Sequence, residues 1–246
     1  HKEYRRQRQM CIRDRVSGAR RTIRLAGAGL MALALSACGV AKVDEVSVKW
    51  PPFRDGTPVV LPSDPTQCPD LAGTYQAQGE YRSGDRDAKS LNDLRNFLSY
   101  PLDLQGMRDH VLPEWQSNPA ATVAFTPAAG GWDVLALDGR GARSAAHLPV
   151  LNGAQDAAAL THDARPGVPD GIRRQTGCAQ GRLWVSVRHD WRQYESMGVR
   201  RHVALFRPEA GGLLVTVRLE SDSIGLLPWY SNEGSVFQYW FAPVAR

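Results

Sequence analysis

The side chains best suited to chemistry gather between residues 184 and 202. Histidine, carboxylate and aromatic groups lie close together there: Trp184, His189, Asp190, Trp191, Tyr194, Glu195 and His202. Imidazoles and carboxylates within one hairpin could bind a metal ion or act as an acid and a base. The alternative, which we favour, is that His189–Met197 is an exposed loop between two strands, with the aromatic side chains packed at its base. A second pair, His162 and Asp163, lies in a polar, alanine-rich stretch, and we expect it to be solvated.

Aromatic residues near the carboxyl terminus form another candidate group: Trp229, Tyr230, Tyr239 and Trp240. Aromatic faces with a polar edge can bind sugars or lipids. Packing in a core or at a sheet edge is the alternative that we favour. The chain contains no G-x-S-x-G, H-E-x-x-H, P-loop or G-x-G-x-x-G motif. We therefore expect no metal and no cofactor, and we favour a protein that is not an enzyme.

The residues before position 38 have the pattern of a secretory signal. Three arginines between positions 20 and 24 precede a short apolar run, Leu25–Ala37. The run is shorter than the 20 or so residues of a membrane span. It ends in Leu35-Ser36-Ala37-Cys38, which resembles the lipobox of bacterial lipoproteins. The resemblance implies that the sulfur of Cys38 carries a diacylglycerol and that the signal peptide, residues 16–37, is removed.

The same resemblance implies a location. Proteins with two or more acyl chains are stably anchored, so the expected partner is a membrane, through acylated Cys38. Gly39 follows the cysteine, where lipoproteins retained in the inner membrane usually have aspartate. We therefore expect the outer membrane, with the protein on its periplasmic face.

Residues 1–15 precede a complete signal, and residues 8–15 resemble a translated sequencing-adapter artefact. The alternative is an extended basic region of the signal. Either way, we expect residues 1–15 to be no part of the folded domain.

Removing the leader changes the charge of the chain. Residues 1–37 hold nine of the 30 basic and two of the 25 acidic residues, so residues 38–246 hold 21 basic and 23 acidic residues, a net charge of −2. No basic patch remains that would indicate a nucleic-acid partner.

Two cysteines remain for the folded part of the protein. Cys11 lies in the leader and Cys38 is the expected lipid attachment, which leaves Cys68 and Cys178. The periplasm is oxidising, and neither residue has a C-x-x-C spacing. We favour a structural disulfide over a nucleophile or a metal ligand.

The chain after Cys38 divides into two parts. Residues 38–68 are rich in proline, and we expect an extended tether apart from a short strand at Val43–Trp50. Residues 69–246 form the expected β-rich domain. The chain enters this domain through a segment that is similar to the start of many periplasmic lipoprotein domains: Cys68-Pro69-Asp70-Leu71-Ala72-Gly73-Thr74-Tyr75. This similarity assigns a function to none of these residues.

Two short helical patterns come first in this domain. Ser90 is a candidate cap for a helix whose apolar face comprises Leu91, Leu94, Phe97 and Leu98, and Tyr100-Pro101 ends it. Leu104, Met107 and Val111 suggest a second helical turn that ends at Pro113.

Strand patterns follow. Thr122–Phe125 and Trp132–Leu137 flank a glycine-containing connection, Leu183–Val187 alternates, and Val236–Phe241 is an aromatic strand. Arg201–Arg207 and Leu213–Leu219 should pair around Pro208–Gly212, with one dry face and one wet face. The predicted fold class is α+β, mostly an antiparallel β meander with one or two short helices packed on it. A small closed β-barrel is the alternative.

Three functions fit this sequence. The first is a lipid-anchored, periplasm-facing lipoprotein that binds or scaffolds an envelope protein, glycan or lipid. The second is an envelope hydrolase that acts on cell-wall glycan or lipid, which needs His189, Asp190 and His202 to converge on one pocket. The third is a barrel that carries an apolar ligand, which needs an empty apolar interior.

Overall fold

The structure is a computed structural model, and it describes residues 40–50, 58–85, 92–100, 102–104, 106–107, 115–158, 171–193, 195–225 and 230–245. Residues Val40–Arg246 make one compact unit. Some predictions concern residues outside the described ranges. These residues are 1–37, Cys38, Ser90, Leu91, Val111, His162, Asp163, Tyr194 and Trp229.

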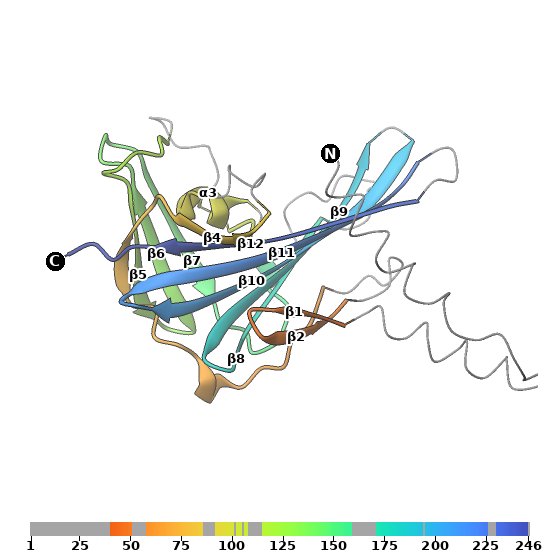
Figure 1. The fold of residues 1–246 in the computed structure, drawn as a ribbon, viewed down its shortest axis with the longest axis horizontal. Coiled ribbons are helices and arrows are strands. Elements are labelled where there is room, and N and C mark those ends of the chain that lie inside the picture. The colour runs from red at the N-terminus through yellow and green to blue at the C-terminus, as the bar shows by residue number, and fades with distance from the viewer. Residues whose placement is uncertain are drawn as a thin grey trace, which may run out of the picture. The chain divides into compact units, whose positions relative to one another are not determined.

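The described strands form three antiparallel sheets (Figure 1). A two-stranded hairpin comprises β1 (Val40–Val43) and β2 (Val46–Lys49). The small sheet has the order β3-β5-β6-β7, with strands Gly73–Gln76, Thr122–Ala128, Gly131–Leu137 and Arg143–Pro149. The large sheet has the order β4-β12-β11-β10-β9-β8, with strands Glu80–Gly84, Tyr230–Phe241, Gly212–Ile224, Ser196–Glu209, Arg182–Gln193 and Ile172–Ala179.

The predicted meander is confirmed in the large sheet, where β8 to β12 are consecutive neighbours. Strands β10 and β11 pair antiparallel, with Arg201 opposite Glu220 and Arg207 opposite Leu214. Their turn is Ala210-Gly211, and both residues have positive φ angles, of 50° and 77°. A glycine adopts this conformation without steric cost, so the glycine-rich connection predicted this hairpin correctly.

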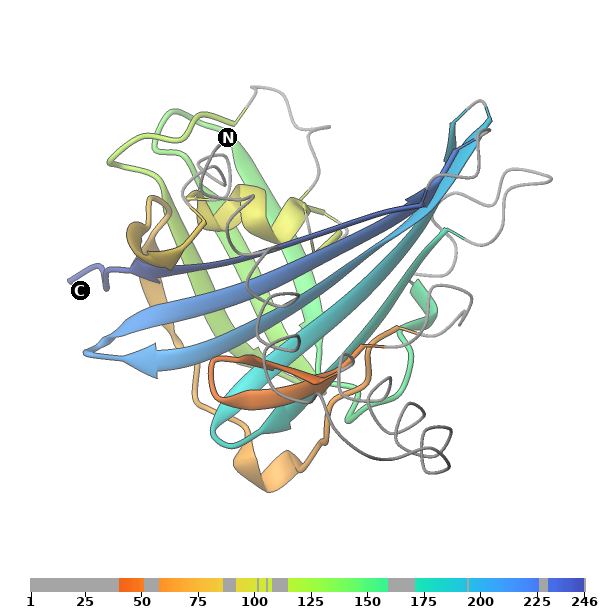
Figure 2. The same ribbon diagram turned by 45° about the vertical axis from the view of Figure 1, so that its right-hand side comes forward.

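A hydrophobic core lies between the two larger sheets. Valine and phenylalanine side chains from β5 and β6 meet those of β9 to β12, and both groups contact helix α3 (Leu94–Ser99). In Figure 2 the helix lies beside the strongly curved large sheet. Five phenylalanines of this core are almost fully buried: Phe97, Phe125, Phe206, Phe237 and Phe241.

The helix begins later than the sequence predicted. Asp93, not Ser90, is its cap, and the Asp93 carboxylate accepts a hydrogen bond of 2.9 Å from the backbone N–H of Asn96. The predicted end at Tyr100 is correct, because Tyr100 is the C-cap residue. Leu104 and Met107 are buried in a turn rather than a helix. No helix among the described residues has the length and hydropathy of a membrane span.

The two larger sheets are linked at both edges without merging. An isolated bridge joins Tyr75 of β3 to Pro243, just after β12, and another joins Gln155 to Gln175 of β8. At the second edge the buried Arg174 pairs with Asp156, and it donates to the Asp103 carbonyl at 2.9 Å. Because the described strands stay in separate sheets, the predicted alternative of a closed barrel is wrong.

The opposite face of the large sheet, which we call the outer face, is also covered at its centre. The β1–β2 hairpin and residues 58–61 pack there against Trp184, Val203 and Leu205. The described part of residues 38–68 is therefore folded against the sheet, and it differs from the predicted extended tether. The predicted wet face is also wrong at this place, because Trp184 and Leu205 are fully buried.

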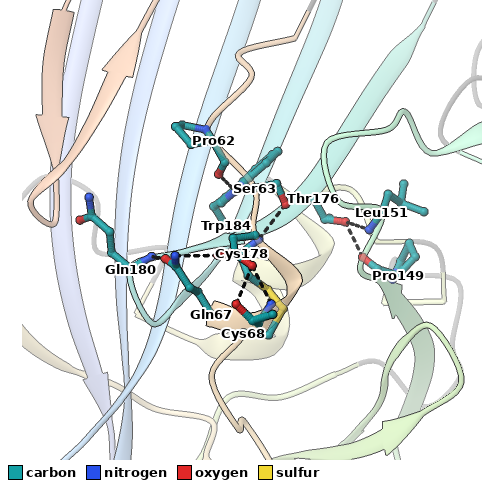
Figure 3. Close-up of a disulfide and its surroundings, with 12 residues drawn as sticks. Pro62, Ser63, Gln67, Cys68, Pro149, Leu151, Thr176, Cys178, Gln180 and Trp184 are labelled. Carbon is teal, nitrogen blue, oxygen red and sulfur yellow. Dashed lines mark hydrogen bonds between the residues drawn. A yellow bond between two sulfur atoms is a disulfide. The ribbon is translucent and has the colours of Figure 1, made fainter.

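The predicted disulfide is present. Cys68 and Cys178 are bonded, and their Cα atoms lie 4.8 Å apart. Cys178 is a buried residue of β8 itself, whereas Cys68 follows a short 3-10 helix, Pro65–Gln67. Figure 3 shows the hydrogen bonds around this bridge, among them Cys178 N–H to Ser63 Oγ at 3.3 Å. The bridge joins the covering segment 58–68 to the edge strand of the large sheet.

Candidate binding surface

Most of the polar residues predicted as a loop between positions 189 and 197 lie in strands, and of the described members of the group only Glu195 is in the turn. Strand β9 runs to Gln193 and β10 begins at Ser196, so the two strands form one long hairpin. Neighbouring residues of a strand point to opposite faces of the sheet. His189 therefore lies on the inner face with Val187, while Asp190 lies on the outer face, and the pair cannot act on one ligand.

The two histidines of the hairpin share the inner face. His202 is buried directly opposite Val187, and its ring packs edge-on against Tyr100 at a centroid distance of 5.7 Å. His189 lies opposite Arg200. Within the described ranges, no group of three histidine, cysteine, aspartate or glutamate side chains is placed to hold a metal ion.

The predicted aromatic group is spread along one strand. Tyr239 belongs to the inner core, while the indole N–H of Trp240 donates to the Glu209 carbonyl at 2.9 Å. Tyr230 stands at the other end of β12, nine residues from Tyr239, a span of about 30 Å. The described members of this group therefore form no shared platform.

The outer face instead carries a charged cluster that was not predicted from the sequence. Three arginines each pair with a carboxylate: Arg188 with Asp190 at 2.7 Å, Arg201 with Asp222 at 2.8 Å and Arg218 with Glu220 at 2.6 Å. Arg188 and Arg201 lie directly opposite each other on β9 and β10, so their positive charges need the two aspartates. The cluster is neutral as a whole, and its residues are buried or half-buried.

Two of these ion pairs have a signal in the sequence. Arg188 and Asp190, like Arg218 and Glu220, are two residues apart in a strand, so both members point to the same face. Opposite charges at this spacing within a strand could have indicated a polar patch on the sheet. The Arg201–Asp222 pair joins two strands, and only the register reveals it.

Asp222 is the centre of the hydrogen bonds in this cluster. Besides Arg201, its carboxylate accepts a bond from the Tyr230 hydroxyl and one of 2.6 Å from the Asn232 amide. Burial, together with the hydrogen bond and charge of Asp222, raises the pKa of Tyr230 to about 12. Burial also lowers the pKa of Arg201, an effect that Asp222 opposes. These contacts hold the ends of β10, β11 and β12 together.

An apolar row lies beyond the cluster, on the same face. Met197, Ile224 and Tyr230 are direct cross-strand neighbours on β10, β11 and β12, and Arg192 of β9 lies next to Met197. Met197 is 49% exposed and Tyr230 is 57% exposed, while Ile224 between them is half-buried.

We call the strand ends that carry this row the distal arm: residues 188–193, 196–201, 220–224 and 230–234. Figures 1 and 2 both show these ends extending away from the small sheet and helix α3. Among the described residues, these strand ends therefore stand apart from the small sheet and helix α3.

A close contact on the inner face stiffens the distal arm. Trp191 lies opposite Gly198, and a Cβ atom added to Gly198 would be 2.5 Å from the indole ring and 2.6 Å from the Asp222 carbonyl. Only glycine leaves room for this packing. Arg200 stacks on the same indole, with 5.7 Å between its guanidinium carbon and the ring centroid.

Comparison of the chain with protein-family models, with curated proteins and with solved structures found no match. The function is therefore inferred from the residues and the geometry described above.

Proposed function

We propose that this chain is a lipoprotein anchored through acylated Cys38 to the periplasmic face of the outer membrane. There it binds or scaffolds a protein, glycan or lipid of the envelope. One observation carries this proposal. The compact unit begins at Val40, so a cut between Ala37 and Cys38 removes none of its residues and leaves the acylated cysteine two residues before the first strand.

The disulfide supports an oxidising compartment. Bridges between Cys residues persist in secreted and periplasmic proteins and are rare in the reducing cytosol. The Cys68–Cys178 bridge is part of the fold, since Cys178 is fully buried in the core. A chain exported by the signal at residues 16–37 would reach a compartment where this bridge can form.

The interior of the unit supports binding at the surface rather than hydrolysis or the carriage of an apolar ligand. Large side chains, among them Phe97, Phe206 and Phe237, are buried between the larger sheets. A carrier of an apolar ligand needs this space for its cargo. The hydrolase hypothesis depends on the convergence of His189, Asp190 and His202, and strand alternation puts Asp190 on the opposite face from the histidines.

Metabolic labelling with a fatty-acid analogue tests the anchor. The wild-type protein should incorporate the label, and Cys38→Ser should incorporate none because it lacks the acceptor sulfur. Ser36→Ala is the matched control, because it keeps a small residue before the cut and should still be labelled. Label on the Cys38→Ser protein would contradict the proposal.

Membrane fractionation tests the location. The labelled wild-type protein should sediment with the outer membrane. Gly39→Asp should shift it to the inner membrane, as the resemblance to bacterial lipoproteins implies, while Gly39→Ser should leave it in place. An identical distribution of the wild-type and Gly39→Asp proteins would count against the outer-membrane location.

A further inference from the structure

We propose that the apolar row Met197–Ile224–Tyr230 of the distal arm is a second membrane contact, which inserts into the phospholipid interface that holds the acyl chains of Cys38. This inference rests on the proposed function, because it requires the anchor. Most large hydrophobic side chains of the described residues are buried, whereas Tyr230 and Met197 are 57% and 49% exposed and share one row.

The chain that carries the anchor enters the unit on the face of this row. Cys38 is two residues before Val40, so its Cα atom is within about 7 Å of the start of β1. The β1–β2 hairpin packs on the outer face of the large sheet, which is the face that carries Met197, Ile224 and Tyr230. Acyl chains on Cys38 would therefore bring this face, and not the small sheet, toward the bilayer.

The open end of the hairpin, where β1 begins, lies nearer to the distal arm than its turn does. Its turn residue Asp44 pairs with Arg182 and Arg207, which lie near the opposite ends of β9 and β10 from the arm. At its open end, Val40 pairs with Lys49, and Trp50 follows Lys49 directly. The ring centroid of Trp50 is 5.7 Å from the Arg218 guanidinium carbon, so this end of the hairpin lies near Arg218. Arg218 is six residues before Ile224 on β11, which is about 20 Å along the strand.

The composition of the row fits a phospholipid interface. Tyrosine is enriched there because its ring is apolar and its hydroxyl is polar, and the hydroxyl of Tyr230 is held by Asp222. Arg192 is an exposed cation directly opposite Met197, and its guanidinium group suits a lipid phosphate.

A polarity-sensitive fluorophore on the arm tests the contact. The Met197→Cys variant of the full chain is acylated in cells, purified and placed in vesicles of phosphatidylethanolamine and phosphatidylglycerol. In the mature chain Cys38 is blocked by the acyl group and Cys68–Cys178 is bonded, so the new thiol takes the label. Leu137→Cys is the matched control, because Leu137 is 40% exposed but belongs to β6 of the small sheet.

The probe at position 197 should be quenched by brominated lipids at least about three times more strongly than the probe at position 137. Adding Tyr230→Ser and Ile224→Ser to the labelled chain should remove most of this difference. Equal, weak quenching at both positions in an acylated protein would overturn the inference and leave the proposed function intact. Absence of fatty-acid label on Cys38 would overturn both, and this readout is independent of the fluorophore.

Discussion

Nη1 of Arg201 lies 2.8 Å from Oδ2 of Asp222, and the two side chains are 3% and 5% exposed. They come from neighbouring strands but are not direct cross-strand partners, because Arg201 lies opposite Glu220. A buried cation beside a second cation, Arg188, requires such a partner. Because the Asp222 carboxylate also accepts hydrogen bonds from Tyr230 and Asn232, the same side chain connects β10, β11 and β12.

Asp222→Asn should lower the free energy of unfolding by about 3–5 kcal/mol, because it leaves the buried Arg201 without its countercharge. Glu209→Gln is the control: it removes one member of the Arg207–Glu209 pair, whose side chains are 30% and 38% exposed, and should cost about 0–1 kcal/mol. Urea unfolding measures both. The double variant Arg201→Met with Asp222→Leu should recover most of the lost free energy of unfolding, because apolar side chains then replace both charges. If Asp222→Asn and Glu209→Gln had equal free energies of unfolding, the buried pair would be unimportant for stability.

Tyr230 should titrate abnormally. Its pKa of about 12 lies above the ordinary value of 10.0, so folding favours the neutral phenol. The resulting stabilisation should be complete below pH 10 and should disappear as the pH rises through about 12. The difference in phenolate absorbance between the wild type and Tyr230→Phe isolates this group. A midpoint of this difference near pH 10 would contradict the burial of the phenol and its hydrogen bond to Asp222.

Val217→Asp and Thr216→Asp should each lower the free energy of unfolding by more than about 3 kcal/mol, because each buries a carboxylate. Val217 and Thr216 lie on opposite faces of β11 and are 0% and 5% exposed. Thermal unfolding of the Cys38→Ser protein measures the losses without the anchor. Ser47→Asp, on an exposed position of β2 opposite Lys42, should change the stability by about 0.5 kcal/mol or less. A mild effect of Thr216→Asp would show that the outer face is wet there.

Removal of the disulfide by Cys68→Ala with Cys178→Ala should cost about 4–5 kcal/mol, because the bridge closes a sequence separation of 110 residues. Chemical denaturation with and without a reductant measures this cost. The reductant should destabilise the wild type by a similar amount and leave the double variant unchanged. If the reductant affected both proteins equally, its effect would not arise from this bridge.

Much of the large sheet could be predicted from residues that are close in sequence. The alternation of Leu213, Val215 and Val217 and the turn before it predicted the β10–β11 hairpin. The register was not predicted, because the turn is shorter than the proposed Pro208–Gly212 connection and Pro208 pairs with Leu213. The polar stretch around His189 was wrongly predicted as a loop, because its charged residues resemble a solvated connection. In the structure the backbone ladder continues past Asp190 to Gln193, and ion pairs satisfy the charges.

The sequence by itself determined the local features of this protein: the strand alternation, the glycine turns, the end of helix α3 at Tyr100 and the pairing of the two remaining cysteines. Each depends on the preference of a few adjacent residues or, for the disulfide, on there being one possible pair. The tertiary structure alone decided that β1 and β2 cover the outer face, that Arg201 meets Asp222, and that Met197 and Tyr230 share an exposed row. These contacts join residues from about 20 to 160 positions apart. Such contacts form only when packing of the whole unit compensates the entropy of closing long loops, so no local pattern encodes them.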